Sequence, residues 1–309
     1  MANLDVKVAV TSPSFSSNPI LREELGLLFS NAKYNDTGKN LNDTDLVQFL
    51  LDCEAAIVGL EKIDQNVLEQ CSKLKVISKY GVGLNNINFD EATLKGVSIV
   101  YSSGVNKRSV SELVLGFMLG VSRNIFSSIS LVKNGEWIKS GGHELSGKTV
   151  GIIGFGNVGQ DLATLLKPFD LKILVNDIVP VKEHSDDYLV TSVTLDQLLL
   201  ESDVITLHVP FDQSTKDLLN ASNLSLIKEG ALIINTSRGG IINEKDLYMI
   251  LDQKNAYAAL DVFLEEPQLN TPLANHPRVF PTPHIGGNSR EAVLAMGRAA
   301  IQNLSKYYE

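Results

Sequence analysis

The sequence predicts an α/β protein built from two doubly wound, parallel-sheet domains. Short apolar, β-branched runs alternate with amphipathic segments along most of the 309 residues, and this alternation is typical of parallel sheets covered by helices on both faces. Hydrophobic residues make up 44% of the chain, which is enough for about two domains with their own cores. One strand, at residues 149–153, leads directly into a glycine-rich turn.

The first hundred residues repeat a strand and helix rhythm. We expect strands at 6–10, 55–60, 75–78 and 98–101, and helices at 19–30, 64–72 and 90–95. Ligands of parallel sheets bind beyond the carboxyl ends of the strands. The loops expected to carry function in this part of the chain are therefore 11–18, 59–62 and 79–86.

The break at Ser102-Ser103-Gly104 indicates a crossing into a second domain, which opens with a long apolar helix at 107–122. Residues 124–144 include the single tryptophan, Trp137, and are less regular. We interpret them as either an arm that reaches a partner chain or an excursion on the surface. Later strands are expected at 149–153, 171–175, 204–209, 231–235, 256–262 and 279–280, with helices at 160–169, 195–201, 220–228 and 244–252.

The last helix, at 289–308, has no strand after it. Packing back on the first domain would let it bury its apolar face. We therefore predict a discontinuous substrate domain, residues 1–102 and 286–309, and a nucleotide-binding domain at 103–285.

The glycine turn Gly154-Phe155-Gly156-Asn157-Val158-Gly159 is the strongest local signal for a ligand. The three glycines permit a sharp turn, close approach of backbone to a pyrophosphate, and close packing of helix on strand. The helix N-terminus offers N–H groups to the phosphates. Asp177, at the end of the next strand, can accept both hydroxyls of an adenosine ribose and would repel a 2′-phosphate. The pattern predicts NAD as the cofactor.

Two other interpretations of this turn remain open at this point. An isolated G-x-G-x-x-G can be an ordinary strand-to-helix turn, because turns use glycine for conformational reasons. Methyltransferases also combine a glycine turn with an acidic strand end. The reaction must therefore be inferred from other residues.

Composition and charge exclude several classes of partner. The formal net charge is −9 and there is no basic stripe, which argues against nucleic acid. No run approaches the roughly 18 apolar residues of a membrane span, and the first residues show no signal peptide, so we expect a cytoplasmic protein without a membrane partner. Cys53 and Cys71 lack metal-ligand spacing and are expected to be reduced, buried thiols. No metal site is predicted.

Three residues that follow expected strands have the chemistry for hydride transfer to a 2-oxo acid. The planar guanidinium of Arg238 can bind a carboxylate with two hydrogen bonds and polarise the carbonyl. His284 can supply the proton, since histidine ordinarily titrates near neutral pH. Glu266 can hold the imidazole and favour its charged form. Each also has a structural interpretation: an arginine capping carbonyls, a solvated acidic loop and a satisfied histidine.

The chain resembles the D-isomer-specific 2-hydroxyacid dehydrogenase family over essentially its full length, and within it the short D-3-phosphoglycerate dehydrogenases. The resemblance rests on many stretches in the right order. They are Lys79-Tyr80-Gly81-Val82-Gly83-Leu84-Asn85-Asn86-Ile87, 104–106, 109–112, 144–154, Leu207-His208-Val209-Pro210, Asn235-Thr236-Ser237-Arg238-Gly239-Gly240, Ala259-Leu260-Asp261-Val262-Phe263, Glu266-Pro267 and Pro283-His284-Ile285-Gly286.

This resemblance implies a flavodoxin-like substrate domain, a Rossmann-like NAD domain, a cleft between them and a homodimer formed through the NAD domain. It implies that Arg238, Glu266 and His284 are catalytic. The cofactor-binding set it implies is Gly154, Gly156, Asn157, Val158, Gly159, Asp177, His208, Val209, Pro210, Thr236, Ser237, Asp261, His284 and Gly286. The substrate-binding set is Lys79, Gly81, Val82, Gly83, Arg238 and His284.

The implied activity is NAD-dependent oxidation of 3-phospho-D-glycerate to 3-phosphooxypyruvate, a step of serine biosynthesis. One departure concerns the phosphate: many phosphoglycerate enzymes carry an arginine in the loop that here reads Gly59-Leu60-Glu61-Lys62. Lys62, Lys79, Lys107 and Arg108 are the other candidate cations. The alternatives are reduction of glyoxylate, hydroxypyruvate or another 2-oxo acid, and an NAD(H)-sensing binding protein similar to the corepressors of this family.

Overall fold

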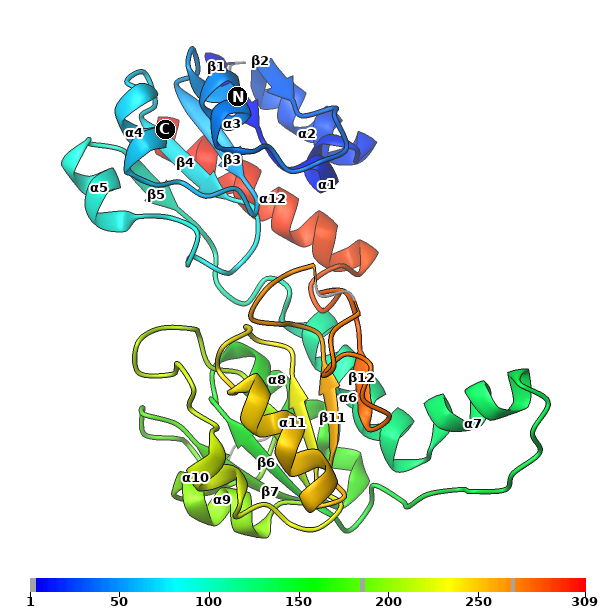
Figure 1. The fold of residues 1–309 in the computed structure, drawn as a ribbon. Helices are drawn as coiled ribbons and strands as arrows, with labels where there is room; N and C mark the ends of the chain where they lie inside the picture. Colours follow the sequence, from blue (N-terminus) through cyan, green and yellow to red (C-terminus); the bar gives the residue numbers. More distant parts are fainter. Residues whose placement is uncertain (1–3, 184–186, 268–269) are drawn as a thin grey trace. The chain divides into compact units, whose positions relative to one another are not determined.

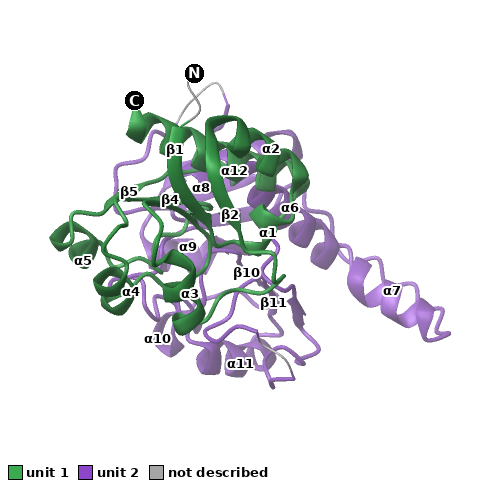
Figure 2. Ribbon diagram, turned by 90° about the horizontal axis from the view of Figure 1, so that it is seen from above, with its two compact units in different colours: residues 1–106, 287–309 green, residues 107–286 purple. Residues whose placement is uncertain are grey.

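The computed structural model describes residues 4–183, 187–267 and 270–309. The chain divides into two compact units, shown in Figure 2. Unit 1 comprises residues 1–106 and 287–309, and unit 2 comprises residues 107–286. The ranges expected from the sequence differ from these units by residues 103–106, at the first crossing, and by Gly286 at the second.

Unit 1 contains a five-stranded parallel sheet in the order β2-β1-β3-β4-β5. The strands are β1 (Leu4–Val10), β2 (Phe29–Tyr34), β3 (Ala55–Val58), β4 (Val76–Lys79) and β5 (Ser98–Val100), and each pairs in parallel with its neighbours. The connecting helices are α1 (Pro13–Ser16), α2 (Pro19–Leu28), α3 (Asp43–Leu50), α4 (Gln65–Gln70) and α5 (Phe89–Leu94). This strand order is the flavodoxin-like order.

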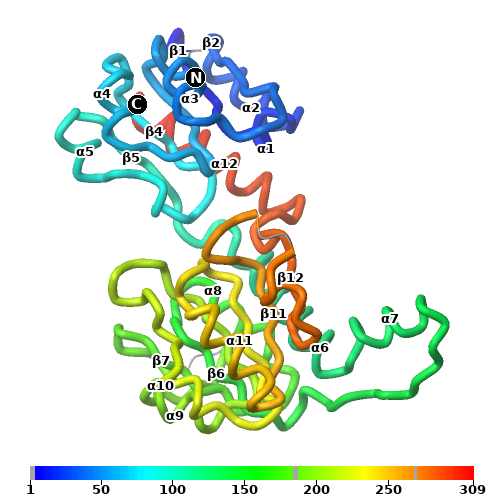
Figure 3. The backbone as a smooth tube through the Cα atoms, in the orientation of Figure 1, coloured from blue at the N-terminus to red at the C-terminus, as the bar shows by residue number. Residues whose placement is uncertain are grey.

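The C-terminal helix α12 (Arg290–Tyr308) completes the core of unit 1. It packs on β4 and α2, as the red helix among the blue and cyan elements of Figure 3 shows. Its buried side chains Met296, Ile301 and Leu304 join an apolar cluster with β1. The buried hydroxyl of Ser78 in β4 donates to the carbonyl of Ala300 at 2.8 Å.

Three elements of unit 1 were not expected from the sequence: the short helix α1, which lies in the loop expected at 11–18, strand β2 and helix α3. Strand β2 (Phe-Ser-Asn-Ala-Lys-Tyr) lies at the sheet edge and is largely solvent-exposed or half-buried, so it lacks the apolar run of a central strand. The helix expected at 19–30 ends at Leu28, because strand β2 begins at Phe29. Asn42 is the N-cap of helix α3, and its side chain accepts a hydrogen bond from the Asp45 N–H.

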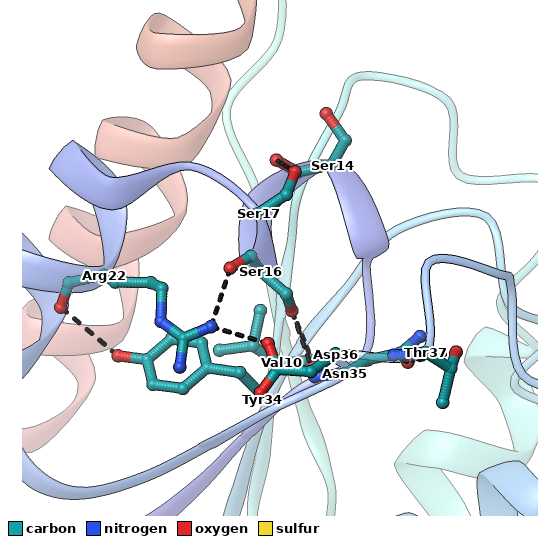
Figure 4. A network of polar contacts seen from close by, with 9 residues as sticks. All are labelled: Val10, Ser14, Ser16, Ser17, Arg22, Tyr34, Asn35, Asp36 and Thr37. Atoms are coloured by element: carbon teal, nitrogen blue, oxygen red, sulfur yellow. Dashed lines mark hydrogen bonds and ion pairs between the residues drawn. The ribbon is translucent and has the colours of Figure 1, made fainter.

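A polar network fixes the carboxyl end of β2 (Figure 4). The Arg22 guanidinium donates to the Ser16 carbonyl at 3.0 Å and to Asp36 at 2.6 Å, and it lies 4.1 Å from the centre of the Tyr34 ring. The Tyr34 hydroxyl donates back to the Arg22 carbonyl at 3.2 Å. Side-chain contacts thus hold an edge strand that has little apolar surface to bury.

Unit 2 contains a seven-stranded parallel sheet in the order β12-β11-β10-β9-β6-β7-β8. The strands are β6 (Thr149–Ile153), β7 (Lys172–Asn176), β8 (Thr191–Ser192), β9 (Val204–Leu207), β10 (Leu232–Asn235), β11 (Tyr257–Leu260) and β12 (Val279–Pro281). The helical segments are α6 (Lys107–Ser122), α7 (Ile125–Lys133), α8 (Asn157–Leu166), η1 (Lys167–Phe169), α9 (Leu195–Glu201), α10 (Ala221–Leu224) and α11 (Glu244–Gln253). The order reverses between β6 and β9, which is the switch point where ligands of doubly wound sheets bind.

The predicted fold class, two parallel-sheet α/β domains, is confirmed. Four of the inner strands, β6, β9, β10 and β11, are buried almost throughout. Strands that are covered on both faces read as continuous apolar runs, and such runs were the signal that predicted these elements.

Helix α7 shows that residues 125–133, in the first part of the stretch expected to be less regular, are helical, whereas residues 136–144 contain no helix or strand. None of its residues is buried, and it projects from the rest of unit 2 in Figure 1. Phe126 is its main inward contact, with ring centres 6.5 Å from Phe117 and 5.3 Å from Phe280. Its mostly apolar but unburied sequence gives little amphipathic contrast, which explains why the pattern did not predict a helix.

Three further findings bear on the expected class of protein. Cys53 and Cys71 are free and buried. Within the described residues, no single helix is long and apolar enough to cross a membrane; α6 and α7 meet that test only as a pair, which is bent by 63°. Across the same residues, no three His, Cys, Asp or Glu side chains gather in a way that would hold a metal ion.

Candidate active site

The glycine turn joins β6 to α8 at the switch point of the unit 2 sheet. Gly154 has a φ of 91°, a conformation that L side chains rarely adopt. Helix α8 begins at Asn157, three residues earlier than the expected 160, and no described side chain caps its N-terminus. The first-turn N–H groups have no partner within the helix and are therefore suited to bind a phosphate.

The two other glycines of the turn differ in their surroundings. A Cβ on Gly159 would lie 2.5 Å from the carbonyl oxygen of Gly154 and 3.2 Å from a methyl carbon of Ile152. At Gly156 no atom lies within 4 Å of such a Cβ. Gly159 thus permits close packing of α8 on β6, and Gly156 leaves open space at the turn.

Asp177 follows β7 and lies beside the turn. One carboxylate oxygen accepts from the Phe155 N–H at 2.6 Å, and the other accepts from the Val179 N–H at 2.9 Å. The side chain is half-buried. An acid is thus fixed at the end of the strand that neighbours the glycine turn, as the dinucleotide pattern requires.

The 208–210 segment packs against the glycine turn from the next strand, β9. A Cβ on Gly154 would lie 2.7 Å from the carbonyl carbon of His208 and 2.8 Å from a methyl of Val209, so the two segments approach at backbone distance. Burial lowers the pKa of His208 to about 3, and a His208 ring nitrogen lies 3.0 Å from the Thr206 hydroxyl. His208 is therefore neutral near pH 7.

His284 and Glu266 form a hydrogen-bonded pair, with 2.7 Å between Nδ1 and Oε2. The other oxygen of Glu266 accepts from the Phe263 N–H at 3.0 Å. Burial would raise the pKa of Glu266, but the hydrogen bonds from His284 and Phe263 and the charge of Arg238 hold it below its usual value. The carboxylate therefore stays ionised at pH values where exposed glutamates begin to protonate, about 4 to 5.

Asp261 fixes the segment that carries His284. It is 1% exposed, and its Oδ1 accepts from the Thr282 hydroxyl at 2.6 Å and the Ile285 N–H at 2.7 Å. Its Oδ2 accepts from the Gly286 N–H at 2.8 Å. His284, between these anchors, has a φ of 54°, a conformation that persists only where the surroundings enforce it.

Arg238 follows β10, and its own segment is held by Asn235 and Ser237. Asn235 donates to the Arg238 carbonyl at 2.9 Å and accepts from the Ser237 N–H at 3.0 Å. A Cβ on Gly239 would overlap the backbone of Phe263, so glycine allows the Arg238 segment to pack on the one that leads to Glu266. Burial lowers the pKa of Arg238 and the Glu266 carboxylate opposes that effect; the guanidinium remains charged.

The buried hydroxyl of Thr236 is suited to bind a ligand in unit 2. It has no hydrogen-bond partner among the described residues. A buried hydroxyl without a partner costs roughly 1–3 kcal/mol. Together with the open turn at Gly156 and the uncapped α8, this hydroxyl fits a bound dinucleotide.

The loop of unit 1 expected to bind substrate follows β4. Gly81 has a φ of 117°, and residues 81–83 are half-buried. Tyr80 supports the loop: its ring packs edge-on against Phe15 at 5.7 Å, and its hydroxyl lies 3.1 Å from that of Ser14. Lys79 is buried beneath the loop, at 4% exposure.

Sequence reasoning located the charged groups but missed the residues that hold them. Asn235 and Thr282 carry no charge and were not assigned a role, although an asparagine at a strand end commonly bonds to the backbone two residues on. Asp261 was expected near the cofactor, and within unit 2 both of its oxygens bind the His284 segment. Gly286, also expected near the cofactor, donates its N–H to Asp261.

Unit 2 therefore combines a dinucleotide turn with an arginine, a glutamate and a histidine on neighbouring strand ends, which is the arrangement of a nicotinamide-dependent oxidoreductase. Residues 115–286 match the family model described as D-isomer specific 2-hydroxyacid dehydrogenase, NAD binding domain. The chain belongs to the D-isomer specific 2-hydroxyacid dehydrogenase family, and its cofactor is NAD.

Relatives within this family are named for activities on different substrates. The chain is 35% identical to hydroxypyruvate reductase of Thermotoga maritima, over 94% of this chain and 96% of that protein. It is 36% identical to D-3-phosphoglycerate dehydrogenase of Methanocaldococcus jannaschii over 97% of this chain, but it spans only 57% of that protein's length. A glyoxylate reductase from Paecilomyes thermophila has a similar structure, with a TM-score of 0.86, 26% identity and coverage of 99% and 96% of the two chains.

The two glycines of the turn give a matched pair of variants. We expect Gly159→Ala to lower the free energy of unfolding of unit 2 by about 1–3 kcal/mol, because its methyl group would overlap the Gly154 carbonyl. Gly156→Ala, in open space, should unfold like the parent to within about 0.5 kcal/mol but bind NADH at least roughly tenfold more weakly, since its methyl group would obstruct the pyrophosphate. Urea unfolding and NADH fluorescence titration measure both. Equal stabilities of the two variants would contradict the packing argument.

Proposed function

We propose that the protein is an NAD-dependent oxidoreductase that interconverts D-2-hydroxy acids and 2-oxo acids. The observation that carries this proposal is the 2.7 Å contact between His284 and Glu266, in a unit where Arg238 and the glycine turn also lie at the carboxyl ends of the strands. In this arrangement a general acid, its partner and a carboxylate-binding cation accompany an NAD-binding turn.

Each of the three residues has a distinct role in this proposal. The Arg238 guanidinium binds the substrate carboxylate and polarises the C2 carbonyl. His284 donates a proton to the C2 oxygen during reduction and removes it during oxidation. Glu266, ionised and bonded to Nδ1, holds the ring in place and stabilises its charged form. NAD, when bound, accepts or supplies the hydride at C2.

The expected cofactor contacts follow from the positions described above. The first-turn N–H groups of α8 would bind the pyrophosphate, and Asp177 the adenosine ribose. Thr236 and the 208–210 segment, which follow the neighbouring strands β10 and β9, would line the nicotinamide side. In unit 1, the half-buried backbone of residues 81–83 is the predicted substrate-binding segment. A cytoplasmic location without nucleic-acid or membrane partners remains a prediction from composition.

The substrate within this class has two candidates. The motifs predict 3-phosphoglycerate, and a D-3-phosphoglycerate dehydrogenase is 36% identical. Hydroxypyruvate or glyoxylate is the alternative, supported by the reductase of Thermotoga maritima and by a glyoxylate reductase of Thermococcus litoralis that is 37% identical over 79% of this chain and 77% of that protein.

The direct test is NADH oxidation at 340 nm with glyoxylate, hydroxypyruvate and phosphohydroxypyruvate. We expect turnover with at least one of these acids, and the preferred acid identifies the substrate class. NADH binding without turnover of any of them would contradict the proposal and favour the NAD(H)-sensing alternative.

Removal of the proton donor should separate chemistry from cofactor binding. We expect His284→Ala to lower kcat by about 10²–10⁴-fold with NADH affinity unchanged. Glu266→Gln keeps a hydrogen bond but loses the charge, so its smaller loss of kcat for reduction should be partly restored at lower pH. Steady-state kinetics across pH and NADH titration give both results. Loss of NADH binding in His284→Ala would contradict the assigned role.

We also propose that the protein is a homodimer formed through α7 and the segment after it. Ile125, Ile129 and Val132 share one face of α7 and are 44%, 50% and 52% exposed. In the segment after α7, Trp137 and Ile138 are also exposed, at 79% and 55%. Exposed apolar side chains on one face of a projecting helix are typical of a subunit contact.

Charges on this face of α7 should separate the subunits. We expect the double variant Ile129→Glu with Val132→Glu to run as a monomer in size-exclusion chromatography with light scattering, where the parent runs as a dimer. Ser127→Glu, on the opposite face of the same helix, is the matched control and should remain dimeric. A parent protein that is monomeric at micromolar concentration would contradict the dimer proposal.

A further inference from the structure

The loop after β3 in unit 1 contains a buried acid, Glu61, which is 3% exposed. Its Oε2 accepts from the Thr11 hydroxyl at 2.7 Å and from the Gly59 N–H at 3.1 Å. Its Oε1 is buried and has no hydrogen-bond partner among the described residues. A carboxylate in such surroundings requires a nearby cation.

Lys79, at the end of β4, is a buried cation that is linked to Glu61 through Gly59. Its ammonium donates to the Gly59 carbonyl and to the Asn86 side chain, the latter at 2.8 Å. Asn86 in turn donates to the carbonyls of Gly59 and Glu61, at 3.1 and 2.6 Å. Glu61 and Lys79 are therefore both buried and both hydrogen-bonded to Gly59, the carboxylate to its N–H and the ammonium to its carbonyl.

In the loop where phosphoglycerate enzymes often carry an arginine, Gly59 leaves little space for a side chain, because a Cβ there would lie 3.0 Å from the Ser12 Cβ and 3.4 Å from a carboxylate oxygen of Glu61. Two of the other cations expected to bind phosphate are also engaged by acids: Lys62 pairs with Asp64 at 3.2 Å, and Arg108 with Asp161 at 3.0 Å. A phosphate dianion requires cations and N–H donors that are not already compensated.

We propose that Glu61 is a specificity-determining residue: by neutralising Lys79 at the carboxyl edge of the unit 1 sheet, it makes the protein select an unphosphorylated 2-oxo acid over a phosphorylated one. The substrate class this assigns is a small 2-oxo acid with an uncharged C3 substituent, such as hydroxypyruvate. The proposal rests on the oxidoreductase activity proposed above. Glu61 acts on the charge of its surroundings and takes no part in hydride or proton transfer.

The test compares kcat/KM for phosphohydroxypyruvate and hydroxypyruvate in three variants of the full chain. The parent should prefer hydroxypyruvate. Glu61→Gln keeps the shape and removes the negative charge, so the ratio of phosphorylated to unphosphorylated kcat/KM should rise by roughly tenfold or more, mainly through KM. Lys79→Met leaves Glu61 uncompensated and should lower the same ratio.

Glu54→Gln is the matched control because it removes an acid from the opposite end of the same strand. Glu54 pairs with Lys75 at 2.7 Å, just before β3 and β4 begin, and its loss should leave the ratio unchanged. A merely structural role of Glu61 would lower both kcat/KM values and leave their ratio constant.

The outcomes distinguish this proposal from the proposed function. Turnover with an unchanged ratio in Glu61→Gln and Lys79→Met overturns the specificity role alone. A parent protein that prefers phosphohydroxypyruvate also overturns the specificity role, and this result does not depend on whether any variant folds. Absence of turnover with either acid overturns the oxidoreductase function and, with it, the specificity role.

Discussion

The geometry of the site depends on one buried carboxylate, Asp261. It binds the hydroxyl of Thr282 and the N–H groups of Ile285 and Gly286, and so fixes the segment that carries His284 on both sides. Charge-assisted hydrogen bonds of this kind are among the stronger ones in proteins. Because the segment is fixed, the left-handed backbone of His284 is tolerated and its ring meets Glu266. The position of His284, the proposed proton donor, is thus determined by a residue that need not contact the substrate.

Sequence reasoning recovered the inner strands because their physical cause is local. The runs at β6, β9, β10 and β11 are apolar since both faces of these strands are buried. The charged residues at strand ends could be singled out from the sequence, because each follows a run that predicts a buried strand. Edge strand β2 and helix α7 could not be predicted, since an edge strand is held by side-chain contacts such as that between Arg22 and Asp36, and the exposed apolar side chains of α7 form no face buried within unit 2.

The parts of the site that could not be predicted are those that depend on spatial contact between distant segments. In the sequence, Glu61 is one acid in a polar loop. Only the fold shows that its side chain is buried, that it binds Thr11, and that Gly59 links it to Lys79. The same holds for Asn235, which appears as an uncharged residue at a strand end but shapes the Arg238 segment. Residue type indicates what a side chain can do, and the network around it decides its charge and orientation.

The return of the chain to unit 1 has a consequence for the order of folding during synthesis. Helix α12 supplies Met296, Ile301 and Leu304 to the unit 1 core, yet it is made after every residue of unit 2. The hydroxyl of Ser109 donates to the Gly286 carbonyl at 2.6 Å, so the two ends of unit 2 meet within unit 2 itself. Domains usually complete their cores in the order in which the ribosome delivers them. In this chain, unit 2 is synthesised in full before α12, so one face of the unit 1 sheet lacks its covering helix until residues 290–308 emerge.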